Sequence, residues 1–248
     1  MTASRRSALL QEIGIGPQWQ LRHRVASAVP ETLEASAADD LAALPAASDE
    51  AAAIAAMDWE QLQQAVAVCR RCGLCEGRNH SVLGIGDRQA KWLFVGEGPG
   101  RNEDLCGEPF VGPAGKLLDN MLAAMGLRRG DNAYIANVVK CRPTDGNGRD
   151  RPPTATEIAT CMPYLQRQIA LIKPAIIVAL GKTAALSLLQ LDPATPVASL
   201  RGKVHRHAGL PLIVTYHPAY LLRNLADKKK TWTDLCLALD TYAKPLRP

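Results

Sequence analysis

The sequence lacks an apolar run long enough to cross a membrane. Its clean apolar stretches, such as residues 175–180, are far shorter than the about 20 residues that a spanning helix needs. Arg5 and Arg6 lie near the N-terminus, but the apolar segment of a secretory signal does not follow them. We therefore expect a cytoplasmic protein without a membrane partner.

Nucleotide-binding fingerprints and internal repeats are also missing. The glycine-rich stretch 96–104 has neither the Lys-Ser/Thr ending of a phosphate-binding P-loop nor the spacing of a dinucleotide-binding loop. No motif recurs at a fixed period. The stretch does place Gly96, Gly98 and Gly100 around Pro99, and such glycines let the backbone approach a ligand closely.

Charge is unevenly distributed along the 248 residues, of which 47% are hydrophobic, enough to bury a substantial core. Residues 1–60 carry four basic and nine acidic side chains, a net charge of −5, and residues 61–248 carry 25 basic and 15 acidic ones, a net charge of +10. A basic part behind an acidic leader favours a polyanionic partner. Ordinary solvated charge explains the same numbers equally well.

Two parts of the chain differ in composition. Ala is the commonest residue in the stretch 26–58, with scattered Pro, Ser, Asp and Glu, which predicts a flexible linker because there is little bulky apolar material to bury. The preceding residues 9–19 are richer in large apolar side chains, as in a docking peptide or in a helix that packs on its own domain. We therefore divide the chain into residues 1–58, a docking segment with its linker, and a folded domain, residues 59–248.

Helical and strand patterns alternate from Trp59 onward, where Trp59, Leu62 and Val66 recur at helical spacing. Short buried strands are predicted at residues 92–96, 133–139, 176–180 and 211–215. Helices are predicted at residues 115–125, 154–172, from Gly181 to 189, and 231–242. The alternation predicts a three-layer α/β/α fold with a central, mostly parallel four-stranded sheet. Ligands bind such sheets at the carboxyl ends of the strands.

Seven cysteines in a chain without an export signal favour free thiols and metal ligation over disulfides. Cys69 and Cys72 form a Cys-x2-Cys pair, and Cys141 and Cys161 follow after an α/β unit. Thiolates gathered from such distant points suit a soft metal centre, either a four-thiolate zinc or an iron–sulfur cluster. The spacing leaves both open.

Three side chains lie near the end of a predicted strand or in a loop that follows one, toward the expected ligand-binding edge. Phe110 lies between Pro109 and a glycine-bearing turn and could present its ring to a ligand, although a single Phe is usually a core residue. Asn137 interrupts an apolar strand, and its amide either reads the edge of a pyrimidine or caps a loop. His217 directly follows the fourth strand, which places its imidazole at the same edge.

A further segment has the composition of a DNA contact. Leu221 and Leu222 are followed by Arg223 and then by three lysines, residues 228–230. Exposed leucines beside basic residues suit a wedge into a base stack next to phosphate contacts. The alternative is that the two leucines begin a helix and pack inward.

In this order, the motifs resemble those of the family 4 uracil-DNA glycosylases, the iron–sulfur members of their superfamily. The resemblance covers about residues 65–243 and leaves residues 1–60 uncovered. It rests first on the cysteine pair Cys69-x2-Cys72 and on residues 76–78 after it. The other matching segments are residues 96–100 with Glu103 and Asp104, residues 109–112, residues 137–143, Cys161, and residues 217–223.

The resemblance implies a [4Fe–4S] cluster held by Cys69, Cys72, Cys141 and Cys161. The cluster would be structural, since the chemistry of the family has no redox step. Cys75 repeats the Cys-x2-Cys spacing at a position where the family usually has another residue, and we expect it to be a spare thiol. Two further cysteines are expected to be spare as well, Cys106 and Cys236.

The resemblance also implies a reaction: hydrolysis of the N-glycosidic bond of deoxyuridine in DNA, after the nucleotide is flipped out of the stack. Phe110 would stack on the base and Asn137 would read its N3–H and O4 edge, beside the close backbone of Gly98. His217 would stabilise the charge that grows at O2. The attacking water would be held by Glu97, with Glu103 as the second choice and backbone carbonyls of the loop as the third.

Some relatives carry a histidine in an Arg-rich insertion after the second strand and bind DNA covalently. Residues 142–153 contain no histidine, which favours turnover by hydrolysis. Two other classes compete: a non-catalytic iron–sulfur module for DNA binding or redox sensing, and a zinc-stabilised hydrolase of free nucleosides. The order of base-pocket motifs and the basic segment after His217 favour the glycosylase. We expect a monomer whose residues 1–24 dock onto a replication or repair protein.

Overall fold

The computed structural model describes residues 47–244, which lie in one compact unit, Pro45–Pro248. The described helices are α2 (Ala47–Ala56), α3 (Trp59–Ala67), α4 (Arg101–Cys106), α5 (Pro113–Ala124), α6 (Ala155–Ile172), α7 (Lys182–Leu189), α8 (Val197–Leu200), α9 (Pro218–Arg223) and α10 (Lys228–Ala243). Two 3-10 turns, Gly73–Cys75 and Leu225–Asp227, join them. None of the helices within residues 47–244 is long and apolar enough to span a bilayer.

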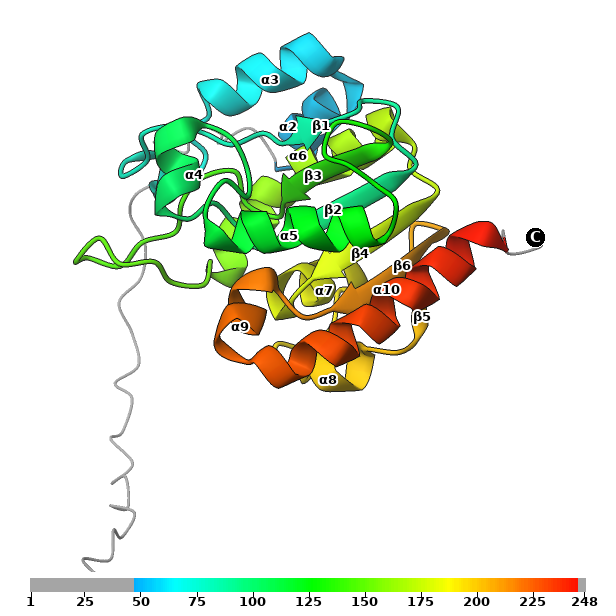
Figure 1. The fold of residues 1–248 in the computed structure, drawn as a ribbon. Coiled ribbons are helices and arrows are strands. Elements are labelled where there is room, and N and C mark those ends of the chain that lie inside the picture. The colour runs from blue at the N-terminus through cyan, green and yellow to red at the C-terminus, as the bar shows by residue number, and fades with distance from the viewer. Residues whose placement is uncertain (1–46, 245–248) are drawn as a thin grey trace, which may run out of the picture. The chain divides into compact units, whose positions relative to one another are not determined.

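A six-stranded sheet forms the centre of the fold, in the order β1-β3-β2-β4-β6-β5 (Figure 1). Four strands are parallel: β2 (Trp92–Gly96), β3 (Ala133–Asn137), β4 (Ile176–Leu180) and β6 (Leu210–Thr215). These are the four strands that the sequence predicts. β2 and β4 have the predicted bounds. Each is a short apolar run between polar loops, the pattern of a strand that is buried on both faces.

The sheet has two more strands than predicted, both antiparallel and both at its edges. They are β1 (Ile85–Gly86), next to β3, and β5 (Val204–His207), next to β6. Neither carries an apolar run: β1 has two residues and β5 reads Val-His-Arg-His. An edge strand is covered on fewer sides and needs fewer apolar residues, so hydrophobic patterning did not reveal these strands.

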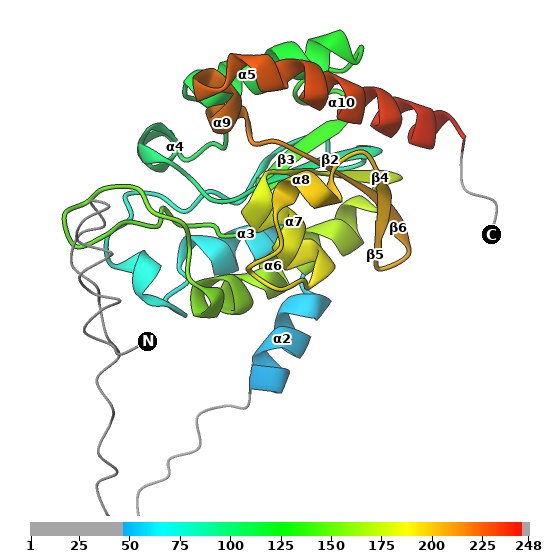
Figure 2. The same ribbon diagram turned by 90° about the horizontal axis from the view of Figure 1, so that it is seen from below.

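Helices cover both faces of the sheet, as the three-layer prediction requires (Figure 2). Odd and even positions of each central strand point to opposite faces. In β2, Leu93 and Val95 join the core that contains α3, α6 and α7, whereas Trp92 and Phe94 join the core that contains α5, α9 and α10. The predicted uracil-DNA glycosylase-like layering is therefore present.

The last part of the stretch predicted to be a linker, Ala47–Ala56, is a helix. This helix, α2, packs against α6, with Ile54 only 4% exposed in the core. Alanine is the strongest helix former, and one well-placed Ile is enough to anchor the helix. Residues 1–46, which include the predicted docking segment, lie outside the described residues.

Strand register brings one residue of each central strand to the same edge of the sheet. Gly96 pairs with Asn137, and Leu180 pairs with Thr215. The loops that leave these carboxyl ends carry the residues predicted to bind a ligand. This edge is where a site is expected in a parallel sheet.

Candidate active site

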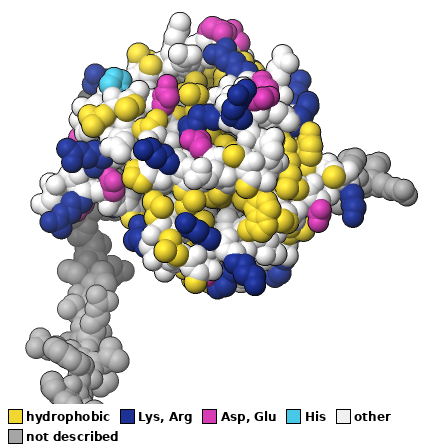
Figure 3. All heavy atoms as spheres, in the orientation of Figure 1, with side chains coloured by type: hydrophobic (Ala, Val, Ile, Leu, Met, Phe, Trp, Pro, Cys, Tyr) yellow, Lys and Arg dark blue, Asp and Glu magenta, His cyan; other side chains and the backbone are white. Residues whose placement is uncertain are grey.

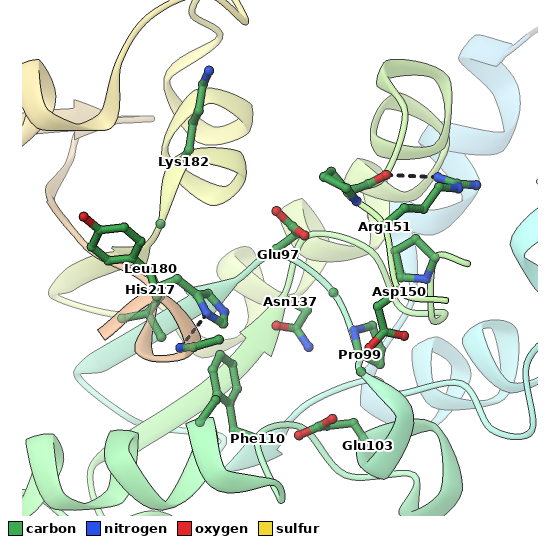
Figure 4. A pocket seen from close by; sticks show the side chains of 18 of the residues that line it. Glu97, Pro99, Glu103, Phe110, Asn137, Asp150, Arg151, Leu180, Lys182 and His217 are labelled. Carbon is green, nitrogen blue, oxygen red and sulfur yellow. Dashed lines mark hydrogen bonds between the residues drawn. The ribbon is translucent and has the colours of Figure 1, made fainter. Parts of the chain in front are cut away.

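A cavity of about 490 Å³ opens at the carboxyl ends of the central strands. Glu97, Asn137, Phe110 and His217 lie around the same space, as Figure 4 shows. All six residues that the sequence analysis assigned to catalysis or base binding line this cavity: Glu97, Gly98, Glu103, Phe110, Asn137 and His217. The structure thus gathers in one place residues that are far apart in the sequence.

Phe110 is held in a backbone conformation that few non-glycine residues adopt, with φ at 57°. Arg129 donates hydrogen bonds to the carbonyl oxygens of Pro109 (2.7 Å) and Phe110 (2.9 Å). Gly115 makes room, because a Cβ there would lie 1.6 Å from the carbonyl oxygen of Phe110. These contacts fix the ring in the cavity wall, 5.5 Å from the ring of His217.

Asn137 is the last residue of β3 and is 2% exposed. Its Oδ1 atom is buried and has no hydrogen-bond partner among the described residues. A buried acceptor without a partner is costly, by about 1–3 kcal/mol. Gly96 is packed against it, since a Cβ on that glycine would lie 2.4 Å from Oδ1. The arrangement suits a ligand that supplies an N–H.

His217 caps the N-terminus of α9 with its ring. Its Nδ1 accepts a hydrogen bond of 3.1 Å from the backbone N–H of Ala219, which places the proton of the neutral ring on Nε2. Removal of the ring from solvent, and then the charge of Arg223, lower the pKa of His217 to about 4. The imidazole is therefore neutral near pH 7 and has one N–H to donate. Gly181, at φ 93°, leaves space for it.

The two predicted carboxylates have different surroundings. Oε1 of Glu103 accepts hydrogen bonds from the backbone N–H groups of Val111 (3.0 Å) and Gly112 (3.1 Å), so this side chain holds the loop that carries Phe110. Glu97 accepts a hydrogen bond from the hydroxyl of Thr183, at the start of α7. No backbone N–H donates to the carboxylate of Glu97 in the described hydrogen bonds, so this carboxylate is the freer of the two to bind a water.

The four cysteines predicted to be metal ligands line one small cavity, together with apolar residues and Lys140. Cys75 is not among the residues that line it. Arg78 donates a hydrogen bond of 3.0 Å to Sγ of Cys141, and the backbone N–H of Lys140 donates one of 3.3 Å to Sγ of Cys161. Within residues 47–244, no three His, Cys, Asp or Glu side chains are arranged closely enough to hold a single metal ion.

Comparison with known proteins gives the family. Residues 83–237 match the Uracil DNA glycosylase superfamily. The chain belongs to this superfamily. The family resemblance drawn from the sequence motifs is confirmed, and with it the fold class.

Several relatives are type-4 uracil-DNA glycosylases. The one from Archaeoglobus fulgidus is 47% identical over 160 residues, which are 62% of this chain and 78% of the relative. The one from Pyrobaculum aerophilum is 39% identical over 199 residues, 76% of this chain and 99% of the relative. The one from Thermotoga maritima is 43% identical over 170 residues, 68% of this chain and 85% of the relative.

The segment after His217 differs in part from the prediction. Leu221 is 1% exposed and packs in the core beside α5 and α10, so the expectation that both leucines are exposed is wrong for this residue. Its position on α9 turns it toward the sheet, whereas Leu222 is 41% exposed. Leu225, 64% exposed, was missed. Arg223 is exposed and lines the active-site cavity. Lys, Arg and apolar side chains alternate over the face that carries α5, α9 and α10 (Figure 3).

Sequence analysis missed several residues of this superfamily member's pocket. Lys182 lines the pocket at the start of α7, where its neighbour Thr183 donates to Glu97, and Asp150 and Arg151 come from the loop before α6. The first two follow a predicted strand directly, and the same rule that selected Asn137 and His217 would have found them. Arg129 gave no local signal, because its role depends on a contact with a distant loop.

Proposed function

We propose that the chain hydrolyses the N-glycosidic bond between uracil and deoxyribose in DNA, which releases uracil and leaves an abasic site for base excision repair. The observation that carries this proposal is the buried, unpaired Oδ1 of Asn137, which lines the same cavity as Phe110 and His217. The relatives, which are named uracil-DNA glycosylases, support the same reaction.

In the proposed complex, the uracil nucleotide is flipped out of the duplex and its base lies against Phe110. Oδ1 of Asn137 accepts the N3–H of uracil, and Nδ2 donates to O4. Cytosine has an acceptor at N3, so it leaves Oδ1 of Asn137 unpaired. A pocket built to hydrogen-bond one group rejects the base that lacks it more strongly than a merely apolar pocket does.

Cleavage of the bond leaves negative charge on the departing base, and His217 is placed to stabilise it at O2. The neutral ring has its proton on Nε2, and a preorganised donor aimed at developing charge contributes without rearrangement. Its low pKa is compatible with this role, because the ring is a neutral hydrogen-bond donor and not an imidazolium.

We assign the attacking water to Glu97. Its carboxylate lines the cavity and is oriented by Thr183, whereas Glu103 is engaged by two backbone N–H groups. Glu103 is thus a residue that positions Phe110, and it remains the second choice as the water's partner. Gly98 belongs to the same wall, where a Cβ would lie 2.7 Å from a methyl group of Val139.

We further propose that Cys69, Cys72, Cys141 and Cys161 hold a [4Fe–4S] cluster. The all-sulfur donor set around one apolar cavity, with hydrogen bonds to two of the sulfur atoms, fits such a cluster. Within residues 47–244 no three such side chains are arranged to hold a single metal ion, so the four thiolates would hold a multi-iron cluster rather than one zinc. The group would tie the loop after α3 to β3 and α6, and glycosidic hydrolysis needs no redox step.

The DNA contacts of the proposal are Leu222 as the wedge and Arg223 beside the cavity, with lysines 228–230 near the phosphates. Leu221 would support the wedge from the core. The protein would act as a cytoplasmic monomer on uracil-containing DNA. Residues 1–24 are proposed to dock onto a replication or repair protein, with the following stretch up to α2 as the linker.

The experiment that tests the proposal is a single-turnover assay on anaerobically purified protein with a fluorescent oligonucleotide that contains one uracil. Alkali-labile cleavage at the uracil, and none in a matched oligonucleotide with cytosine, is expected. Binding of both oligonucleotides without any excision would overturn the proposal in favour of a non-catalytic DNA-binding module.

A further inference from the structure

Lys140 is a buried cation that the proposed chemistry does not use. It is 1% exposed, among the most deeply buried large side chains of the described part. Its Nζ donates hydrogen bonds to the backbone carbonyl of Asn137 (2.7 Å) and to Oε1 of Gln168 (2.5 Å). Within residues 47–244, no carboxylate forms an ion pair with it in the structure. A buried ammonium without an anionic partner costs several kcal/mol, on the order of the desolvation penalty of an ion.

The compensating charge comes from the cysteine cavity. Lys140 lines that cavity, and its backbone N–H is hydrogen-bonded to Sγ of Cys161. Cys141 is the next residue along the chain, and both Cys141 and Cys161 line the cavity with Lys140. Thiolates held there by a metal centre would therefore be the counter-ions of Lys140.

The ammonium of Lys140 also contacts the backbone of a residue that lines the base-binding pocket. The carbonyl that accepts its ammonium belongs to Asn137, the residue whose side chain carries the unpaired acceptor. Gln168 holds the ammonium in place and is itself fixed, since its Nε2 donates to the carbonyl of Leu83 (2.9 Å) and to the hydroxyl of Tyr134 (3.3 Å). One side chain thus connects the cysteine cavity to the peptide group that orients Asn137.

We propose that Lys140 is a positioning residue for uracil recognition. The negative charge of the thiolate site holds its ammonium in place, and the ammonium fixes the backbone of Asn137 and so the direction of the Asn137 amide. The inference rests on the proposed function. It gives the metal centre a part in base recognition through electrostatics alone, without any redox change. Loss of the ammonium should therefore weaken the binding of uracil and leave the contacts with the DNA backbone intact.

The test is Lys140→Met in the full-length holoprotein. The matched control is Lys91→Met, at an exposed lysine just before β2, where the central strands begin. Free uracil serves as a competing ligand in the excision assay. We expect Lys140→Met to weaken inhibition by uracil and to slow excision by about 10-fold or more, the range typical of groups that orient a binding residue. Iron content and affinity for an abasic-site oligonucleotide should stay at the level of Lys91→Met.

A double-mutant cycle separates positioning from general damage. If Lys140 acts through Asn137, then Lys140→Met should cost little more once Asn137 is Ala, because the two changes remove the same interaction. If Lys140→Met loses iron or fails to fold, Gln168→Met replaces it in the cycle. Gln168→Met removes one hydrogen-bond acceptor of the ammonium and keeps the charge of Lys140.

Full additivity of the two changes, or unchanged uracil inhibition in an iron-loaded variant, would overturn the inference while the proposed function stands. A wild-type protein that neither excises uracil nor is inhibited by it would overturn both.

Discussion

The ring of His217 lies 5.5 Å from the ring of Phe110, with 29° between their planes. The two residues arrive from loops after β2 and β6, and each is fixed by its own contacts, Phe110 by Arg129 and His217 by the N–H of Ala219. In the proposed complex, a base that stacks on Phe110 brings its O2 edge to the imidazole. Stacking and charge stabilisation are thus set by one rigid pair of rings.

Replacement of His217 by Ala should lower the single-turnover rate of uracil excision by about 10²–10³-fold, the effect of removing one preorganised donor. Affinity for uracil-containing DNA should change little, because the phosphate contacts are elsewhere. Excision at the wild-type rate would remove His217 from the mechanism.

The lowered pKa of His217 predicts a pH dependence of stability. Between its usual value of 6.5 and about 4, the unfolded chain binds a proton at this ring and the folded chain does not. Protonation then favours the unfolded state, so the free energy of unfolding contributed by His217 falls as the pH is lowered through this window. Urea unfolding of the wild type and of His217→Gln, each at pH 7 and at pH 4.5, measures this contribution of His217 to the free energy of unfolding. The variant should lose less stability on acidification, and an equal loss in both proteins would contradict the assignment.

Asn137→Ala should weaken both the rate and the choice of base. A pocket that loses its hydrogen-bonding partner forfeits about 2–4 kcal/mol for the base it was built to bind. The measurement is the ratio of excision rates for uracil and for a base without the N3–H pattern. A lower rate with an unchanged ratio would mean that Asn137 supports the fold and does not read the base.

Two cysteine variants test the ligand set. Wild type should absorb near about 400 nm and contain about four iron atoms per chain. Cys161→Ala should lose the colour and much of the soluble yield, whereas Cys75→Ala, outside the cysteine cavity, should lose neither. Stoichiometric zinc in a colourless wild type would overturn the cluster assignment. Bleaching by Cys75→Ala would instead change the ligand set.

Two truncations separate the N-terminal segment from the fold. Removal of residues 1–46 should leave uracil excision and the melting temperature unchanged if the segment serves docking. Removal of residues 1–60 also deletes α2 and the start of α3, including the buried Ile54, and should lower the melting temperature clearly. Destabilisation by the shorter truncation would show that the segment belongs to the fold, as a Trp19 packed on the domain would require.

Hydrophobic patterning predicted the parallel core of the sheet almost to the residue. Strands buried on both faces, such as β2 and β4, are continuous apolar runs, and this pattern located them. The edge strands and α2 were not predicted, because partly buried elements show little regular spacing of apolar residues. β5, for example, has two histidines and an arginine among its four residues. The helix α2 needed only Ile54 and the neighbouring α6 to be stable.

The sequence by itself predicted residues that the fold brings to one cavity. The strand pattern drew attention to Phe110, Asn137 and His217, the family resemblance added Glu97, and all four line that cavity. The same sequence could not show which of the two leucines after His217 is buried, because local composition does not reveal which side of a short helix faces the core.

Only the tertiary structure decided how these residues are held and which of them are free to act. The fold leaves Oδ1 of Asn137 without a partner among the described residues, engages Glu103 with two backbone N–H groups, and joins the ammonium of Lys140 to the carbonyl of Asn137. Each of these facts depends on the packing of the folded chain. Hydrogen-bond satisfaction and electrostatic compensation are set by the folded surroundings, so residue types alone do not specify them.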